Sequence, residues 1–283
     1  MNRAPIVAGM FYPSDPVELA RQASALCLPE KLAAEELLRP KPLARMVMLP
    51  HAGYVYSGRV AGLTLAQVDL PQDLVLLGPC HRVRGQGLSV WGSGKWVTPL
   101  GEISVAEDLA AELLNSQADF VEEKEPHLQD HCLEVLLPLL KMRRPDLKIV
   151  PVAVSAHEPA KLRLAALTLA EIIHNRTVSG LEAPALIVSS DMSHYLPQAE
   201  TTRLDNLALE KVLALDGPGL YQTVSQHNIS MCGVLPATLA LQTCKALGAK
   251  EGRLVKYATS GEVSGDFKQV VGYAGVVVEC PPD

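Results

Sequence analysis

The segment M-V-M-L-P-H-A-G-Y at residues 46–54 is the strongest indication of the fold of this 283-residue chain. Its first four residues form a continuous apolar run, which is typical of a strand that is buried on both faces of a sheet. The same layout, an apolar run followed by a short polar turn, recurs at residues 74–81 and 185–195. Helical patterns lie between these segments. We therefore predict an α/β fold with a central mixed or mostly parallel sheet, helices on both faces and a single domain over residues 1–283.

Helix signals between the strands support this alternation. The run S-D-P-V-E at residues 14–18 predicts a helix start, because the aspartate can cap and proline fits the first turn. A capping box at 104–107 predicts a second helix, and 132–142 reads as a third that a following proline ends. Residues 28–42 are expected to form a surface connection with a short helical piece. Further helices are expected at 57–67, 159–174, 202–215 and 235–247, and further strands at 147–154, 254–258 and 270–279.

The composition excludes several classes of protein. The 25 basic and 31 acidic residues give a net charge of −6, and aromatic residues make up 4% of the chain. Neither a phosphate-neutralising surface nor an aromatic stacking platform is expected, so we predict no nucleic-acid partner. The apolar runs are too short to cross a bilayer, and the first residues lack the apolar core of a secretory signal. These features predict a cytoplasmic protein with no membrane partner.

The six cysteines are widely spaced and include no C-x-x-C pair, so neither a disulfide framework nor a zinc finger is expected. Cys232 stands out because it lies just before the predicted helix 235–247, where backbone N–H groups stabilise a thiolate. It is therefore a better metal ligand or nucleophile than Cys244, which lies inside that apolar helix. A buried packing role is the alternative for Cys232.

Four polar side chains follow the predicted strands at their carboxyl ends: His51, His81, Asp191 and His194. Ligands of open α/β sheets bind at this edge, so the four side chains meet in one pocket if the three strands are parallel neighbours. Prolines shortly before His51 and His81 stiffen both turns, as a metal site requires. The alternatives are hydrogen-bonded loop histidines, and for Asp191 and His194 a helix cap and a core histidine.

A further pair, His131 and Glu134, is three residues apart and would share one face of a helix. Such a pair can support other ligands, act as general acid and base, or bind a metal. The alternative is a solvated helix start that Asp130 caps.

Six motifs occur along the chain in a fixed order. They are A-G-M-F-Y-P at 8–13, P-H-A-G-Y-V-Y-S-G at 50–58, L-G-P-C-H at 77–81, D-H-C-L-E-V-L-L-P at 130–138, S-S-D-M-S-H-Y at 189–195 and M-C-G at 231–233. Together they resemble the Memo family (mediator of ErbB2-driven cell motility), in its bacterial and archaeal branch known as AmmeMemoRadiSam system protein B. The resemblance covers about residues 5–278.

This resemblance implies a fold similar to class III extradiol ring-cleavage dioxygenases, which hold non-haem Fe(II) with two histidines and one glutamate. In Memo-like proteins a cysteine takes the place of the carboxylate. The implied metal ligands are His51, His81 and Cys232. The implied catalytic side chains around them are His194, Asp191, His131 and Glu134. Two imidazoles and a thiolate form a soft donor set that favours Fe(II) or copper, with zinc as a further fit.

The resemblance implies a metal-dependent redox enzyme of unknown substrate that takes a small molecule or peptide. The alternative is a non-catalytic accessory protein that partners a radical SAM protein and an AMMECR-type protein. A third hypothesis is a metal-free hydrolase or transferase with Cys232 as nucleophile and His194 or His51 as base. The chain departs from the family at Arg82, where many members carry a second histidine, and any role of that imidazole is in doubt here.

Overall fold

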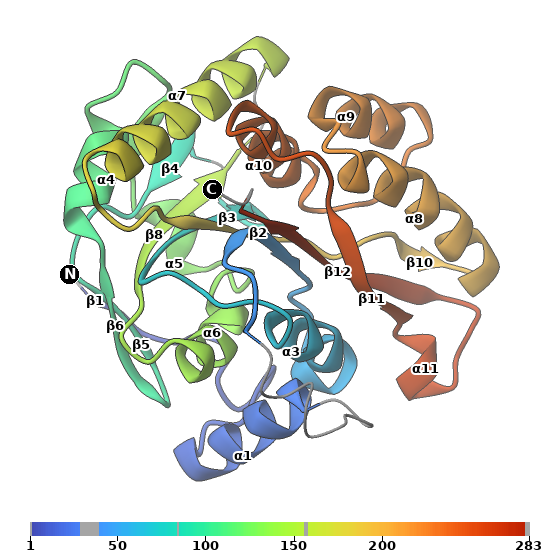
Figure 1. Ribbon diagram of the computed structural model, residues 1–283. Helices are drawn as coiled ribbons and strands as arrows, with labels where there is room; N and C mark the ends of the chain where they lie inside the picture. The colour runs from blue at the N-terminus through green and yellow to red at the C-terminus, as the bar shows by residue number, and fades with distance from the viewer. Residues whose placement is uncertain (1, 29–39, 84, 156–157, 281–283) are drawn as a thin grey trace.

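The computed structural model describes residues 2–28, 40–83, 85–155 and 158–280, and within them twelve strands join one mixed sheet (Figure 1). Five neighbouring strands at its centre are all parallel. In spatial order they are β6 (Gly101–Val105), β8 (Lys148–Val154), β3 (Asp73–Pro79), β9 (Ala185–Ser189) and β2 (Ala44–Leu49). The predicted α/β fold with a mixed, largely parallel sheet is confirmed.

Antiparallel strands extend the sheet on both sides of this centre. Next to β2 runs β12 (Val270–Glu279), which also pairs with β11 (Arg253–Thr259) and β10 (His194–Leu196). On the opposite side, β5 (Lys95–Thr98) pairs with β6, and β1 (Asn2–Arg3) pairs with β5. The remaining strands are β4 (Leu88–Val90), which pairs with β8, and β7 (Phe120–Glu122), which pairs with β4.

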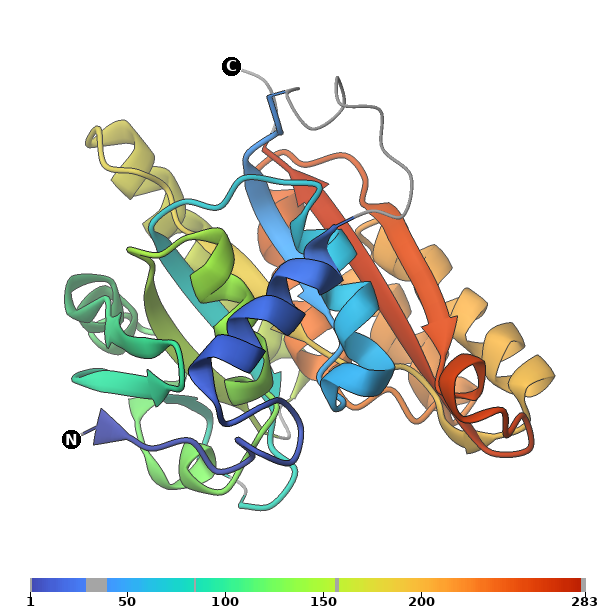
Figure 2. The same cartoon turned by 90° about the horizontal axis from the view of Figure 1, so that it is seen from below.

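Helices cover both faces of the sheet (Figures 1 and 2). One face carries α4 (Glu107–Leu114), α7 (Pro159–Val178), α8 (Gln198–Leu213), α9 (Gly217–Gln226) and α10 (Val234–Ala246), of which α10 packs on β3, β9 and β2. The other face carries α1 (Pro16–Cys27), α3 (Arg59–Leu65) and α6 (Leu137–Arg143). Two short helices, α5 (Glu125–Leu128) and α11 (Gly261–Ser264), lie in connections.

The buried apolar side chains of the central strands explain their continuous apolar sequences. Leu74–Leu77 of β3 are fully buried, because helices cover both faces of the strand. The main cluster of buried apolar side chains extends along the chain from Val7 to Val278.

Four predicted helix starts differ from the structure. The helix expected at 202–215 begins earlier, at Gln198. Ser104 does not begin a capping box, because it lies in β6 and pairs with β5 and β8; the helix begins at Glu107 instead. The segment 132–142 becomes regular only at Leu137, because Pro138 lacks an N–H and fits only the first helical turn. The helix expected at 57–67 starts as a π-helical turn at Tyr54–Gly58. Of the helical piece expected at 28–42, residues 29–39 lie outside the described residues.

Candidate metal centre

The strand order brings the predicted site together, because β9 lies between β2 and β3 and is parallel to both. His51 follows β2, His81 follows β3, and Ser190 and Asp191 follow β9. The three polar turns therefore emerge side by side at the carboxyl edge of the sheet. The condition under which the sequence predicted one shared pocket, that the three strands are parallel neighbours, is therefore met.

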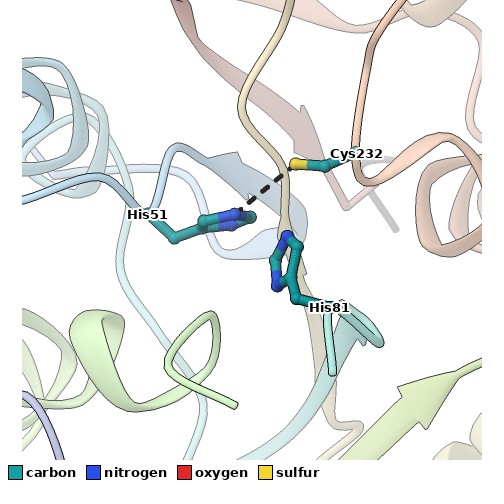
Figure 3. A group of neighbouring side chains, drawn as sticks. All are labelled: His51, His81 and Cys232. Carbon is teal, nitrogen blue, oxygen red and sulfur yellow. Dashed lines mark hydrogen bonds between the residues drawn. The ribbon is translucent and has the colours of Figure 1, made fainter. Parts of the chain in front are cut away.

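One ligand atom from each of His51, His81 and Cys232 lies within 4.8 Å of the others. Figure 3 shows the two imidazoles approaching from separate strand ends while the sulfur faces them from the turn before α10. His51 is 2% exposed, Cys232 is partly buried, and His81 lies toward solvent. The cluster is thus closed on the His51 side and open on the His81 side.

The hydrogen bonds of His51 determine which ring nitrogen is free. Its Nδ1 lies 2.8 Å from Ser189 Oγ, and that hydroxyl donates its own proton to the Cys132 carbonyl at 2.7 Å. Ser189 Oγ must therefore accept from Nδ1–H, which leaves the lone pair of Nε2 directed at Cys232 Sγ, 3.4 Å away. Burial lowers the pKa of His51 to about 3, so the ring is neutral at pH 7, the state that binds metals.

His81 is held in the same tautomer by a carboxylate. Asp130 accepts the backbone N–H of His81 at 2.6 Å and its Nδ1–H at 3.0 Å. Burial opposes ionisation of Asp130, but hydrogen bonds from His81 and from the Cys132 N–H hold the pKa of this carboxyl below its usual range. Asp130 therefore only accepts, and Nε2 of His81 stays available. A carboxylate behind a histidine in this way is the usual support of a metal ligand.

The Cys232 sulfur contacts the main chain of Asp191 at two atoms. The Asp191 N–H donates to Sγ at 3.2 Å, and the thiol reaches the Asp191 carbonyl at 3.6 Å. Burial and the charge of Asp191 raise the pKa of the Cys232 thiol. The expectation of a thiolate stabilised by the helix N-terminus was therefore wrong, because loss of hydration outweighs the backbone N–H groups.

Gly233 lets the turn that carries Cys232 approach β9. A Cβ at this position would lie 2.4 Å from Ser190 Cβ and 2.6 Å from the Ser189 carbonyl oxygen. Only glycine fits so close to another backbone. The M-C-G motif therefore has a steric reason at its third residue.

Asp191 and His194 both lie at this edge, in different roles. Asp191 is buried and accepts the backbone N–H of His51 at 2.8 Å, and burial raises its pKa to about 6. No helix begins at Asp191, because strand β10 follows it, so the helix-cap alternative was wrong. His194 donates Nδ1–H to the Ser230 carbonyl at 2.9 Å, which leaves its Nε2 free. His194 is also close enough to influence the pKa values of His51 and Asp191.

His131 and Glu134 diverge, since the regular helix starts only after them. The His131 ring stacks on His81, with centroids 5.1 Å apart, and lies edge-on to His51 at 5.6 Å. Burial lowers the pKa of His131 to about 4, so this ring, which borders the cluster, is neutral at pH 7. A second group with the spacing of metal ligands joins His81, Asp130 and His131.

Glu134 instead faces the N-terminal segment. Its carboxylate accepts from Arg3, from the backbone N–H groups of Ile6 and Val7, and from the Tyr12 hydroxyl. Among the described residues, no hydrogen bond connects Glu134 to the three imidazoles. Its place is that of an anchor for residues 3–12.

Two supporting residues escaped sequence reasoning. Asp130 was interpreted only as a helix cap, although its position beside His131 marked it as close to the site. Ser189 carried no signal beyond its place at the end of a predicted strand. Arg82, the departure from the family pattern, is exposed next to His81.

Helices long and apolar enough for a bilayer are absent from the part of the chain that the structure describes.

The donor set fits a transition metal, because two imidazole lone pairs and one sulfur converge and each ring is oriented from behind. Residues 3–277 match the family described as Memo-like protein. A MEMO1 family protein of Methanopyrus kandleri is 38% identical over 98% of this chain and 99% of its own length. Those of Aquifex aeolicus and Thermotoga neapolitana are 36% and 37% identical, again over at least 97% of each chain. On this evidence, the chain belongs to the Memo family.

Proposed function

We propose that the protein binds Fe(II) or copper through His51, His81 and Cys232 and carries out redox chemistry on a substrate that enters from the His81 side. One observation supports this most strongly. Both imidazoles have Nδ1 occupied by a hydrogen-bond partner, and the free Nε2 of His51 faces the sulfur. Histidines that bind a metal are usually oriented in this way, by a supporting group bonded to the other ring nitrogen.

The donor types support the choice of metal. Imidazole suits iron, copper and zinc alike, while a thiolate ligand disfavours magnesium and calcium. Three protein ligands leave further coordination positions for a substrate or for oxygen. When bound, iron or copper supplies electron transfer and Lewis acidity at this place.

The protein's own groups around the cluster position it and handle protons. His131 is neutral at pH 7, since burial lowers its pKa to about 4, and a neutral ring can orient a bound molecule by hydrogen bonding. His194 presents a free Nε2 from the start of β10, at the same edge of the sheet. Asp191 connects two of the proposed ligands, because its carboxylate accepts the backbone N–H of His51 and its own backbone N–H donates to the Cys232 sulfur.

The geometry also contains a Cys–His pair, which is the signature of a thiol nucleophile. Cys232 Sγ lies 3.4 Å from His51 Nε2. Burial, however, raises the pKa of the thiol and lowers that of the imidazole. Proton transfer from sulfur to nitrogen is therefore unfavourable, and the metal hypothesis accounts better for the same contact.

Metal analysis of protein purified without oxygen tests the proposal. We expect about one iron or copper per chain, lost in Cys232→Ser because the sulfur is a direct ligand. Cys244→Ser is the matched control, since Cys244 is buried inside α10 and outside the cluster. Wild-type protein that takes up neither iron nor copper under any loading condition would contradict the proposal.

A further inference from the structure

Arg3 is a buried, charged residue. It is not part of the site, but its side chain contacts residues that support the site. The residue is 2% exposed, and its guanidinium lies 4.3 Å above the ring of Trp96. Nη1 donates to Glu134 at 2.7 Å. Nε donates to the His127 carbonyl at 2.8 Å, and Nη2 to the Asp130 carbonyl at 2.6 Å.

Those two carbonyls belong to residues 127–130, the segment that places Asp130. His127 lies in the last turn of α5, and Asp130 lies in the loop between α5 and residue 134. Its one carboxylate at Asp130 accepts the backbone N–H and the Nδ1–H of His81 and the N–H of Cys132. Arg3 and His81 therefore bind the same residue, one through its carbonyl and one through its carboxylate.

The residues that follow Arg3 reach the other imidazole turn. The Tyr54 N–H, three residues after His51, donates to the Phe11 carbonyl at 2.8 Å. The Phe11 ring packs on His131 with centroids 4.9 Å apart. Glu134 holds the segment between these contacts through the N–H groups of Ile6 and Val7. Residues 3–12 thus connect the turns of both histidines.

A stabilising role alone does not account for this arrangement. A buried ion pair costs so much hydration that apolar residues of similar size commonly stabilise a core as well or better. What an arginine provides and an apolar residue lacks is a planar fork that fixes several acceptors in one geometry. Here three of the four acceptors are main-chain oxygens, and two of them belong to residues 127–130.

We propose that Arg3 is a positioning residue for His81. Its guanidinium holds residues 127–130 in place, so that Asp130 fixes the His81 ring with Nδ1 protonated and Nε2 free. The effect of Arg3 on metal affinity rests on the proposed function. The tautomer of His81 in metal-free protein does not depend on that function.

The test compares Arg3→Lys with wild type by two measurements. Lysine keeps the charge beside Glu134, but one ammonium cannot reproduce the fork. Long-range ¹H–¹⁵N correlations of the metal-free protein should show a pure Nδ1–H tautomer of His81 in wild type and a mixture in the variant. Titration with Co²⁺, followed by its sulfur charge-transfer absorption, should show affinity about tenfold weaker, as for other groups that orient metal ligands.

Arg176→Lys is the matched control. Arg176 is also a buried fork, bonded to Asp73, Asp108 and Glu112 at the amino end of β3. It should lower the melting temperature as Arg3→Lys does, while leaving the His81 tautomer and the Co²⁺ affinity unchanged. If Arg3→Lys does not fold, the double variant Arg3→Met/Glu134→Gln leaves no buried charge unpaired and should show the same two losses.

A folded Arg3 variant with the wild-type tautomer and wild-type Co²⁺ affinity would overturn the inference. Wild-type protein that binds no Co²⁺, iron or copper would instead refute the proposed function, and the tautomer measurement would still decide the role of Arg3. The two proposals therefore fail in distinguishable ways.

Discussion

Strand β3 begins at Asp73 in one polar cluster and ends at Pro79 beside another. At its amino end, Arg176 is paired with Asp73, Asp108 and Glu112, so positive charge meets negative charge directly. At its carboxyl end, the neutral ring of His51 faces a protonated thiol, and His51 and His81 each have Nδ1 bonded to a supporting residue. Each cluster has a buried residue, Arg176 in the first and His51 in the second, but only the second gathers ligand atoms around a common point. Burial of polar groups marks a candidate site when their bonding capacity is left incomplete.

The amino end should give the largest change in stability. Arg176→Met removes a buried cation from its three carboxylates, and breaking such a pair costs about 3 kcal/mol, at the low end of the usual range because Asp108 and Glu112 reach water. Urea unfolding measures this loss. Metal content per folded chain should not change; a loss of metal would show that the two ends are coupled.

At the carboxyl end of β3, we expect a single added carbon to lower both the stability and the metal content. Gly233→Ala forces a Cβ against Ser190 and the Ser189 carbonyl, which we expect to cost about 1–3 kcal/mol and to displace the neighbouring sulfur. The free energy of unfolding and the metal content should both fall. Gly53→Ala is the control from the other ligand turn, because its nearest atoms lie at an ordinary 3.6 Å. Equal effects of the two substitutions would contradict the steric role of Gly233.

The smallest expected effect is a pH dependence of metal affinity. Burial raises the pKa of the Cys232 thiol, so it carries a proton at neutral pH that a metal must displace. Burial lowers the pKa of His51 to about 3, so this ring has no proton to lose. Apparent Co²⁺ affinity should therefore rise about tenfold per pH unit around neutrality, with one proton released on binding. An affinity independent of pH would mean that the sulfur is already ionised or is not a ligand.

Sequence reasoning found the longer apolar strands (β2, β3, β8, β9, β11 and β12) and the residues with ligand-type side chains, because apolar runs and side-chain chemistry are local properties. It did not determine the order of the strands: that β9 lies between β2 and β3 depends on pairing between segments more than 100 residues apart. The capping box at Ser104 failed for the same reason, since pairing with two strands overrides a local helix signal.

The residues that support the site were harder to predict than the candidate metal ligands. Asp130 is a good helix cap by its type and position, and only the folded chain shows that its carboxylate is occupied by His81. Glu134 has the spacing of a helical partner to His131, but Pro138 delays the helix and the carboxylate turns to Arg3. Arg3 itself carried no signal, because nothing in a short N-terminal segment indicates which loop it will contact.

The sulfur and the His51 nitrogen that face each other come from positions 181 residues apart in the chain. A newly made chain therefore has both imidazoles long before it has the thiol, and the turn that carries the thiol is placed only when α10 packs on the sheet. A cut that frees the last quarter of the chain would remove the sulfur and the α10 packing in one event. Metal retention in this protein should accordingly report on an intact, fully folded polypeptide.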